Sequence, residues 1–431
     1  MLNPSKRHHP ALVEWRTWFL FVTTIVFLCA CSSCKKADPT GTSPAGSAVA
    51  SVSSAIAAPN LHDRPPPKST RRTTSGEIAL GNLGAEIRGL ERLVEQRKDD
   101  LAIRRNLIES LKFRGEMTGR IADLERAVEM AETLAKDMPD KPEAYLARAA
   151  LRATLHRFDD AWADLDEAER RGSTAGQTRQ KRASILFARG KIDDALVLAE
   201  QMRKERATID TLGFHAVLLG ELGRKSEALA AFREAFEIYP DTSPFPVAWL
   251  FFAQGQFWER EGNTDLAIAY HRACLERLPA HAHAAAHWAR MASPDQAEAI
   301  VKPLLDKVDD PELQAVLSAK LDARGAADAA KEHRIQAGAR YDELVAKHPE
   351  AYVDHAAQFW LDVGGDAPKA FELAKRNLSW RKTARAYELA VVAALAVHDK
   401  QAACTLGTEG VGQGRATSMF RAIVNGACGG K

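Results

Sequence analysis

The chain has 431 residues, a formal net charge of +2, 46% hydrophobic residues and 27% charged residues. This composition is ordinary for a folded chain, and the near-neutral charge provides no broad attraction to a polyanion, so nucleic acid is not expected as a partner. A length of 431 residues exceeds what one compact core usually organises, whereas a stack of repeats grows by adding interfaces between neighbours.

The first 30 residues have the layout of a secretory signal peptide. Basic residues Lys6, Arg7 and Arg16 flank an apolar run at positions 18 to 30. Such a charged segment followed by a short apolar run is typical of a signal peptide. The run is shorter than the roughly 20 apolar residues that a membrane-spanning helix needs, so an uncleaved anchor is the weaker alternative.

The end of this run, Leu28-Cys29-Ala30-Cys31, resembles the bacterial lipoprotein box. The resemblance implies that residues 1–30 are removed and that Cys31 carries the lipid, although processing at Cys34 stays open. It also implies a lipid-anchored protein of the bacterial cell envelope. Ser32 stands where many inner-membrane lipoproteins have aspartate, which favours the outer membrane, facing the periplasm.

Residues 31–75 are rich in Ser, Ala, Pro and Thr and contain almost no large apolar side chains. Such a segment cannot bury enough surface to fold, so we expect a disordered linker. A flexible tether of this length has an end-to-end distance on the order of 35 Å.

From residue 76 to residue 431, apolar residues recur at helical spacing, and this pattern predicts an all-α domain. Small residues within it recur at a fixed period: Ala161, Ala195 and Ala228 lie 34 and 33 residues apart, and Ala267 follows after 39. A period of this size indicates stacked helical hairpins.

Four units over residues 142–281 carry the repeat best. Pro142 suits a first helical turn, and Gly190, Gly223 and Gly262 suit helix ends that need a left-handed residue. The units resemble the tetratricopeptide repeat (TPR), a helix-turn-helix whose small residues let its helices approach closely. The resemblance implies an α-solenoid of stacked TPR-like repeats.

Outside these four units the pattern is weaker. Residues 293 to 296 predict a capped helix start, after which Pro303 should bend the helix. Residues 241 to 246 read as an inserted loop that is a secondary candidate for contacts, and residues 407 to 414, rich in glycine, as a flexible turn.

The TPR resemblance also implies a function and a site. In the family, the concave face of the first helices commonly binds an extended peptide or a partner helix. Among the residues carried over to that face, Trp249 and Phe252 are the preferred anchors, because aromatic side chains dominate many interfaces. Packing against neighbouring hairpins is the alternative for each. The predicted protein-binding row is Gln177, Gln180, Ser184, Phe187, Trp249, Phe252, Gln256, Glu259, His283 and Arg290.

One group of residues could bind a metal. His271 and Cys274 fall on one helix, and His281, His283 and His287 follow the next turn. Imidazole and thiolate suit zinc, but the spacing matches no established zinc motif, so no metal or cofactor is expected. P-loop, HExxH and GxSxG motifs are absent, and we predict no enzymatic activity.

Cys404 and Cys428 flank the last predicted hairpin, and an exported protein can keep a disulfide between them. Together these features predict a noncatalytic scaffold or adaptor for an envelope protein or peptide. The alternatives are a chaperone-like or sensory peptide binder of the periplasm and, less favoured, a metal-dependent enzyme that uses the histidines between His271 and His287.

Overall fold

The computed structural model describes residues 73–413, 416 and 418–429. The predicted signal peptide, Cys31 and all but the last three residues of the predicted linker lie outside this range. Among the helices of the described part, none is long and apolar enough to cross a membrane.

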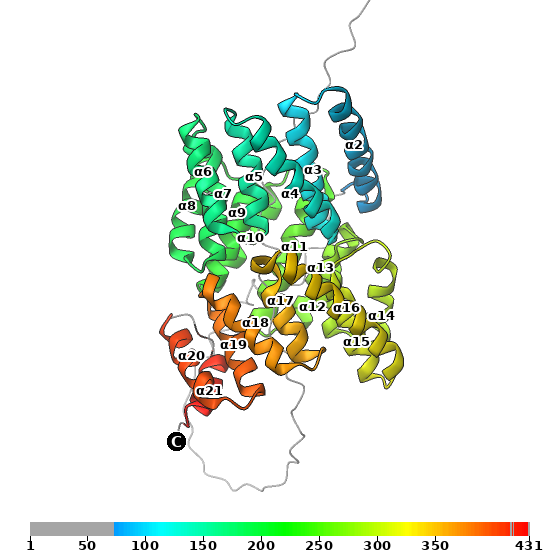
Figure 1. The fold of residues 1–431 in the computed structure, drawn as a ribbon, viewed down its shortest axis with the longest axis vertical. Coiled ribbons are helices and arrows are strands. Elements are labelled where there is room, and N and C mark those ends of the chain that lie inside the picture. The colour runs from blue at the N-terminus through cyan, green and yellow to red at the C-terminus, as the bar shows by residue number, and fades with distance from the viewer. Residues whose placement is uncertain (1–72, 414–415, 417, 430–431) are drawn as a thin grey trace, which may run out of the picture.

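The prediction of an all-α repeat domain is confirmed, since the described residues form helices and no strand (Figure 1). The α-helices are α2 (Gly76–Gln96), α3 (Leu101–Thr118), α4 (Ile121–Asp137), α5 (Pro142–Thr154), α6 (Phe158–Arg170), α7 (Ala175–Ala188), α8 (Ile192–Glu205), α9 (Ile209–Glu221), α10 (Lys225–Ile238), α11 (Pro244–Arg260), α12 (Thr264–Arg277), α13 (Ala282–Met291), α14 (Pro294–Val301), α15 (Pro311–Ala323), α16 (Ala327–Lys347), α17 (Pro349–Asp362), α18 (Ala367–Trp380), α19 (Ala384–Ala396), α20 (Lys400–Gly412) and α21 (Ser418–Ala427).

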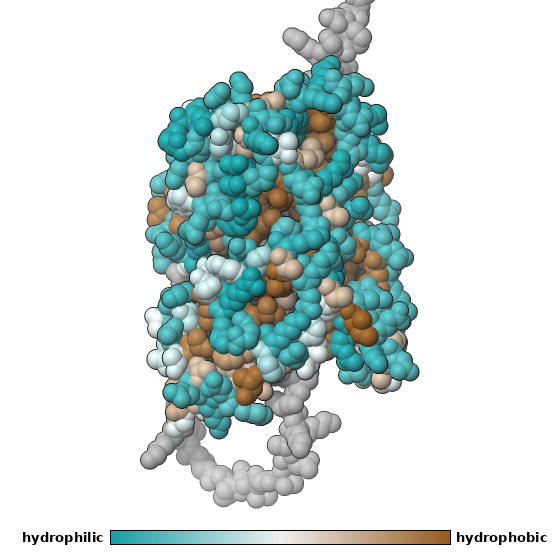
Figure 2. Space-filling view, viewed as in Figure 1, coloured by the Kyte–Doolittle hydropathy of each residue, from teal (hydrophilic) through white to brown (hydrophobic). Residues whose placement is uncertain are grey.

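Each helix packs against its neighbour along the chain, as stacked TPR-like hairpins require. The four periodic alanines lie in the second helices of successive hairpins, and each is fully buried. A methyl group at these positions lets the two helices of a hairpin approach closely. The surface seen in Figure 2 is mostly hydrophilic, with hydrophobic residues in several separate groups.

The first helices of the central hairpins end as the sequence predicts. Gly190, Gly223 and Gly262 have φ values of 79°, 70° and 71°. In the first central hairpin this place is taken by His156, with φ 57°. Its Nδ1 lies 3.1 Å from the carbonyl oxygen of Glu350, a residue of α17 that is 194 positions away. We infer that this contact compensates for the strained backbone of a residue that is not glycine.

The burial of His156 makes stability depend on pH. Burial and the positive charge of Arg381 lower the pKa of His156 to about 3, against the opposing effect of Asp354. The unfolded chain takes up the proton near pH 6.5, so the contribution of His156 to stability is complete above that pH and is lost as the pH falls toward 3.

We therefore expect the free energy of unfolding to fall by about 1.4 kcal/mol per pH unit over this range because of His156. Replacing His156 by Asn removes this contribution, because Asn tolerates the left-handed backbone and can donate to Glu350 but does not titrate. Urea denaturation at several pH values measures the difference. An identical pH dependence in both proteins would show that His156 does not titrate as described.

The weaker repeats follow the prediction with two corrections. Ser293 caps α14 in a capping box with Gln296, as predicted. Pro303 does not bend a continuing helix, because α14 ends at Val301 and Pro303 lies in a 3₁₀ turn (Lys302–Leu304). The predicted loop at residues 241 to 246 is also shorter than expected, since Pro244 already begins α11.

The solenoid turns back on itself, so that later helices lie against earlier ones. Phe113 of α3 packs edge-on against Phe245 of α11, with ring centroids 4.9 Å apart. Asp309 accepts hydrogen bonds from the backbone N–H groups of Ile121 (2.6 Å) and Ala122 (3.0 Å). It thereby caps the N-terminus of α4, whose own N-cap residue makes no capping hydrogen bond to the helix backbone.

This closure encloses α11, which lies in the middle of the domain in Figure 1. Every residue from Pro244 to Trp258 is buried. A helix that is apolar on all sides is typical of a position surrounded by other elements. The predicted binding residues on α7 are therefore in a different environment from those on α11 and α13.

The C-terminal end is fastened by a disulfide between Cys404 and Cys428, whose Cα atoms are 4.8 Å apart. Residues 407 to 412 belong to α20, so they do not form the flexible turn that the sequence suggested. Gly407 and Gly410 are inside α20, and a Cβ at either would approach Val424 or Tyr387 within 2.6 Å. Glycine at these positions lets α20 pack closely against α19 and α21.

Reduction of this disulfide is expected to loosen α20 and α21. A crosslink that closes a loop of 24 residues stabilises the folded state by roughly 3 kcal/mol in the chain-entropy model. Hydrogen exchange before and after reduction should show faster exchange confined to these two helices. Unchanged exchange in both would mean that packing alone holds them.

Candidate functional site

The predicted exposure of the α11 row is wrong. Phe252 is fully buried, Gln256 is 2% exposed and Trp249 is 7% exposed. A Cβ at Gly213 would lie 2.5 Å from the Trp249 ring, so this tryptophan packs directly on α9. The contacts of Trp249 and Phe252 are with α9, α12 and α13, so these side chains pack against neighbouring hairpins, the alternative that the sequence left open.

Phe252 is surrounded by four imidazole rings. Its ring centroid is 4.8 Å from that of His281, 5.4 Å from His287, 5.6 Å from His271 and 6.3 Å from His283. The sequence identified these histidines as a cluster, and the structure brings them together. The sequence did not indicate that Phe252 would lie at the centre of the cluster.

The remaining row residues of α11 and α13 take part in polar contacts inside the domain. Glu259 contacts His271 and His287, while His283 and Arg290 both contact Glu312. The Glu312 oxygens lie 3.2 Å from His283 Nδ1 and 2.5 Å from Arg290 Nη2. These residues therefore serve packing between helices in this conformation.

The row on α7 is only partly accessible. Gln177 is exposed, but its side chain accepts a hydrogen bond from the Thr174 N–H at 2.8 Å in the capping box of α7. Gln180 is half-buried and Ser184 is buried. Phe187 is also buried, and it lines a cavity.

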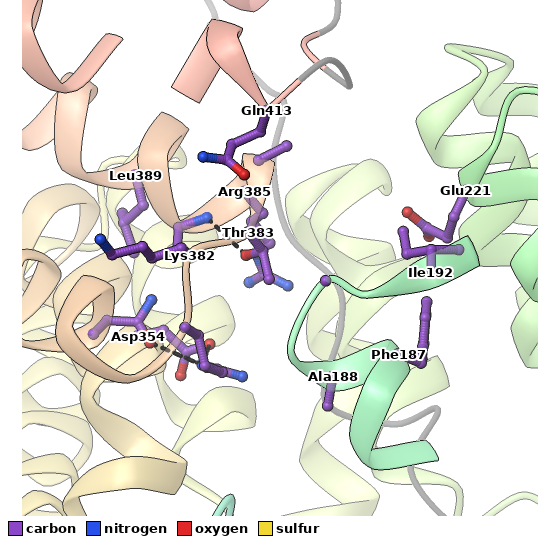
Figure 3. A pocket seen from close by; sticks show the side chains of 15 residues that line it. Phe187, Ala188, Ile192, Glu221, Asp354, Lys382, Thr383, Arg385, Leu389 and Gln413 are labelled. Carbon is purple, nitrogen blue, oxygen red and sulfur yellow. Dashed lines mark hydrogen bonds and ion pairs between the residues drawn. The ribbon is translucent and has the colours of Figure 1, made fainter. Parts of the chain in front are cut away.

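This cavity, of about 230 Å³, lies between the α7–α8 turn and the segment that joins α18 to α19 (Figure 3). Phe187, Ala188 and Ile192 form one wall, and Leu389 belongs to the opposite side. The two sides meet at Gly190, where a Cβ would lie 3.3 Å from Thr383 Cγ2. Residues nearly 200 positions apart thus form one site.

Basic residues gather on the α18–α19 side of the cavity. Arg381 Nη2 lies 2.5 Å from Asp354 Oδ2, and both side chains are buried. Burial alone would raise the pKa of Asp354, but Arg381 and the other nearby cations hold this pKa well below its usual range. Asp354 is therefore ionised at neutral pH and balances Arg381.

Two further cations at the cavity, Lys382 and Arg385, have no direct ion pair, although the Asp354 and Glu312 carboxylates act on Arg385 from a longer distance. Within the described part of the chain, neither Lys382 nor Arg385 forms an ion pair or a side-chain hydrogen bond. Burial lowers the pKa of Arg385 to about 10, so its guanidinium stays charged at neutral pH. The cavity can therefore accept an anionic group on its α18–α19 side, while Glu221, paired with Arg260 at 3.2 Å, lies beside the apolar wall at Ile192.

Sequence reasoning missed this basic segment, although a local signal was present. Residues 381 to 385 contain three basic side chains around Thr383, the N-cap of α19, whose hydroxyl accepts a hydrogen bond from the Ala386 N–H at 3.2 Å. A basic run at a helix start favours anion binding. The opposing wall, which depends on closure of the solenoid, had no local signal.

Comparisons with known proteins find solved structures of low similarity to this chain. The chain is similar to human IFIT1, solved as a dimer with PPP-AAAA, at 14% identity and a TM-score of 0.43 over 79% of this chain and 84% of that one. It is similar to yeast Tom70 at 14% identity and a TM-score of 0.37, covering 82% and 96% of the two chains. A tetratricopeptide repeat protein from Parabacteroides merdae gives 15% identity and a TM-score of 0.31, covering 69% and 98%. No family model and no curated protein matches the chain.

Proposed function

We propose that this protein is a noncatalytic interaction scaffold of the bacterial cell envelope, held to the membrane by a lipid on Cys31. Its partner is a protein that inserts an acidic segment into the cavity between α7 and α18–α19. The observation that carries the proposal is the pair of cations without a direct ion pair, Lys382 and Arg385, beside the apolar wall at Phe187.

The size and shape of the cavity favour a protein segment over a small molecule. Small-molecule pockets usually have about 300–1,000 Å³, whereas this one has about 230 Å³. It can take a few side chains of a larger partner that rests on the surrounding surface. The exposed Lys382 side chain then meets a carboxylate at the rim, and Phe187 contacts apolar atoms deeper inside.

The N-terminal sequence supports the membrane tether. A lipid on Cys31 followed by a flexible linker to residue 75 would place the helical domain at a distance on the order of 35 Å from the bilayer. At this distance the domain can meet partners that stand away from the membrane surface. Metabolic labelling with a fatty acid should mark the wild type and leave Cys31→Ala unlabelled.

Chemical crosslinking in intact envelopes tests the binding site. One recurrent partner is expected with the wild type, and the double variant Lys382→Glu/Arg385→Glu should lose most of it. The matched control is Lys400→Glu, an exposed lysine outside the cavity. Equal recovery of the partner by all three proteins would contradict the proposed site, and many weak partners in place of one would favour a chaperone-like binder.

A further inference from the structure

Glu259, His271 and His287 form a compact cluster at the junction of three consecutive helices. They belong to α11, α12 and α13, respectively. Glu259 Oε1 lies 2.6 Å from His271 Nε2 and 2.8 Å from His287 Nδ1. One nitrogen or oxygen atom from each residue lies within 4.8 Å of those of the other two.

The surroundings hold these side chains in place. His271 is fully buried and His287 is 3% exposed. The His271 ring occupies space that only a glycine leaves free on α11, since a Cβ at Gly255 would lie 2.5 Å from its Cε1 atom. Phe252 packs against both imidazoles. The three ligand atoms are thus brought together before any ion binds.

We propose that this cluster is a zinc site, with His271 Nε2, His287 Nδ1 and a Glu259 carboxylate oxygen as ligands. Two imidazole nitrogens and one carboxylate oxygen are a donor set that Zn²⁺ takes, with bonds of about 2.0–2.2 Å. Ligand atoms around a tetrahedral ion at these bond lengths are about 3.3 Å apart, so the two separations from Glu259 Oε1 need to widen by only about 0.5 to 0.7 Å. A water molecule or another ligand completes the coordination.

The chemistry of the neighbours limits the site to these three residues. His281 is close, but its Nδ1 accepts the Ala284 N–H at 3.2 Å in the N-cap of α13. In neutral His281 the proton therefore sits on Nε2, which leaves no lone pair for a metal. Cys274 is fully buried, and burial raises the pKa of its thiol well above its usual value, which opposes the thiolate form.

A second group of potential ligands, His283, Asp310 and Glu312, lies nearby. The Arg290 guanidinium is 2.5 Å from Glu312 and occupies the place of a counter-ion there. A divalent cation would be repelled by this positive charge. We therefore assign the metal to the Glu259 cluster, with which no arginine or lysine of the described residues forms an ion pair.

The sequence did not predict a metal, because the spacing of the histidines and Cys274 matches no established zinc motif. Glu259 was assigned to the binding row, since it lies on the same face of α11 as Phe252. The zinc site does not depend on the proposed scaffold function, because it involves neither the cavity nor the tether.

Zinc binding by the full-length chain, purified without a histidine tag and stripped with a chelator, tests the proposal. After dialysis against micromolar Zn²⁺, mass spectrometry of the metal content should find about one zinc per chain. Glu259→Gln and His287→Asn should each retain almost none, and the matched control His283→Asn should retain the wild-type amount. Zinc should raise the melting temperature of the wild type and of His283→Asn only.

The wild type alone can refute the site, even if a variant fails to fold. A wild-type chain that binds no stoichiometric zinc, or that binds Co²⁺ without the visible absorption of a four-coordinate nitrogen and oxygen site, overturns the proposal. Stoichiometric zinc that persists in folded Glu259→Gln and His287→Asn would place the metal elsewhere and would equally overturn it.

Discussion

Replacing Phe252 by Ala is expected to lower the free energy of unfolding by about 3–5 kcal/mol. The side chain is fully buried on the enclosed helix α11 and fills the space between four imidazole rings. Its truncation removes apolar contacts and leaves a cavity that rigid helices cannot close completely. Urea denaturation at neutral pH measures the change.

Trp380→Ala is the matched control, because this aromatic residue is 37% exposed. Its loss should change the free energy of unfolding by about 1 kcal/mol or less. The Phe252 result also decides between two interpretations of this residue. Near-wild-type stability combined with loss of the envelope partner would restore Phe252 as a binding anchor and contradict the enclosed position of α11.

Replacing Lys112 by Met is also expected to lower the free energy of unfolding by about 3–5 kcal/mol. Lys112 Nζ lies 2.6 Å from both carboxylate oxygens of Glu116, and each side chain is only 7% exposed. Burial raises the pKa of Glu116 and lowers that of Lys112, while their mutual attraction opposes both shifts. Removing the lysine leaves the buried carboxylate with the neutral Thr154 hydroxyl, 3.0 Å away, as its hydrogen-bond donor.

The double variant Lys112→Met/Glu116→Gln should recover much of this loss, because it leaves no buried charge without a counter-charge. Urea denaturation of the wild type, Lys112→Met, Glu116→Gln and the double variant measures the complete double-mutant cycle. A double variant as unstable as Lys112→Met would show that the loss arises from packing of the lysine stem.

The repeat architecture was accessible from the sequence because its determinants are local. Ala161 and Ala195 mark the close approach of helices within their own hairpins, and Gly190 marks the end of a helix. Each signal refers to residues that are near in the chain. For the same reason, Ser293 was correctly predicted to cap the start of α14. The predicted bend at Pro303 was wrong, because a helix can end before a proline as well as bend at it.

The candidate sites were not accessible because they depend on how far the solenoid turns. His156 and Glu350 are 194 positions apart, and Asp309 and Ile121 are 188 positions apart. Small rotations at every hairpin decide whether these contacts form. Closure brings Phe187 and Arg385 to one cavity. Trp249 and Phe252, in contrast, are buried by the neighbouring helices α9, α12 and α13, where the family resemblance implied an exposed face.

Site-specific photocrosslinking in intact envelopes tests most directly whether the partner occupies the cavity between α7 and α18–α19. A photoreactive amino acid at position 382 should capture one recurrent protein, whereas the same group at the exposed position 197 of α8 should capture little of it. Equal capture at both positions, or capture at position 197 alone, would contradict the account.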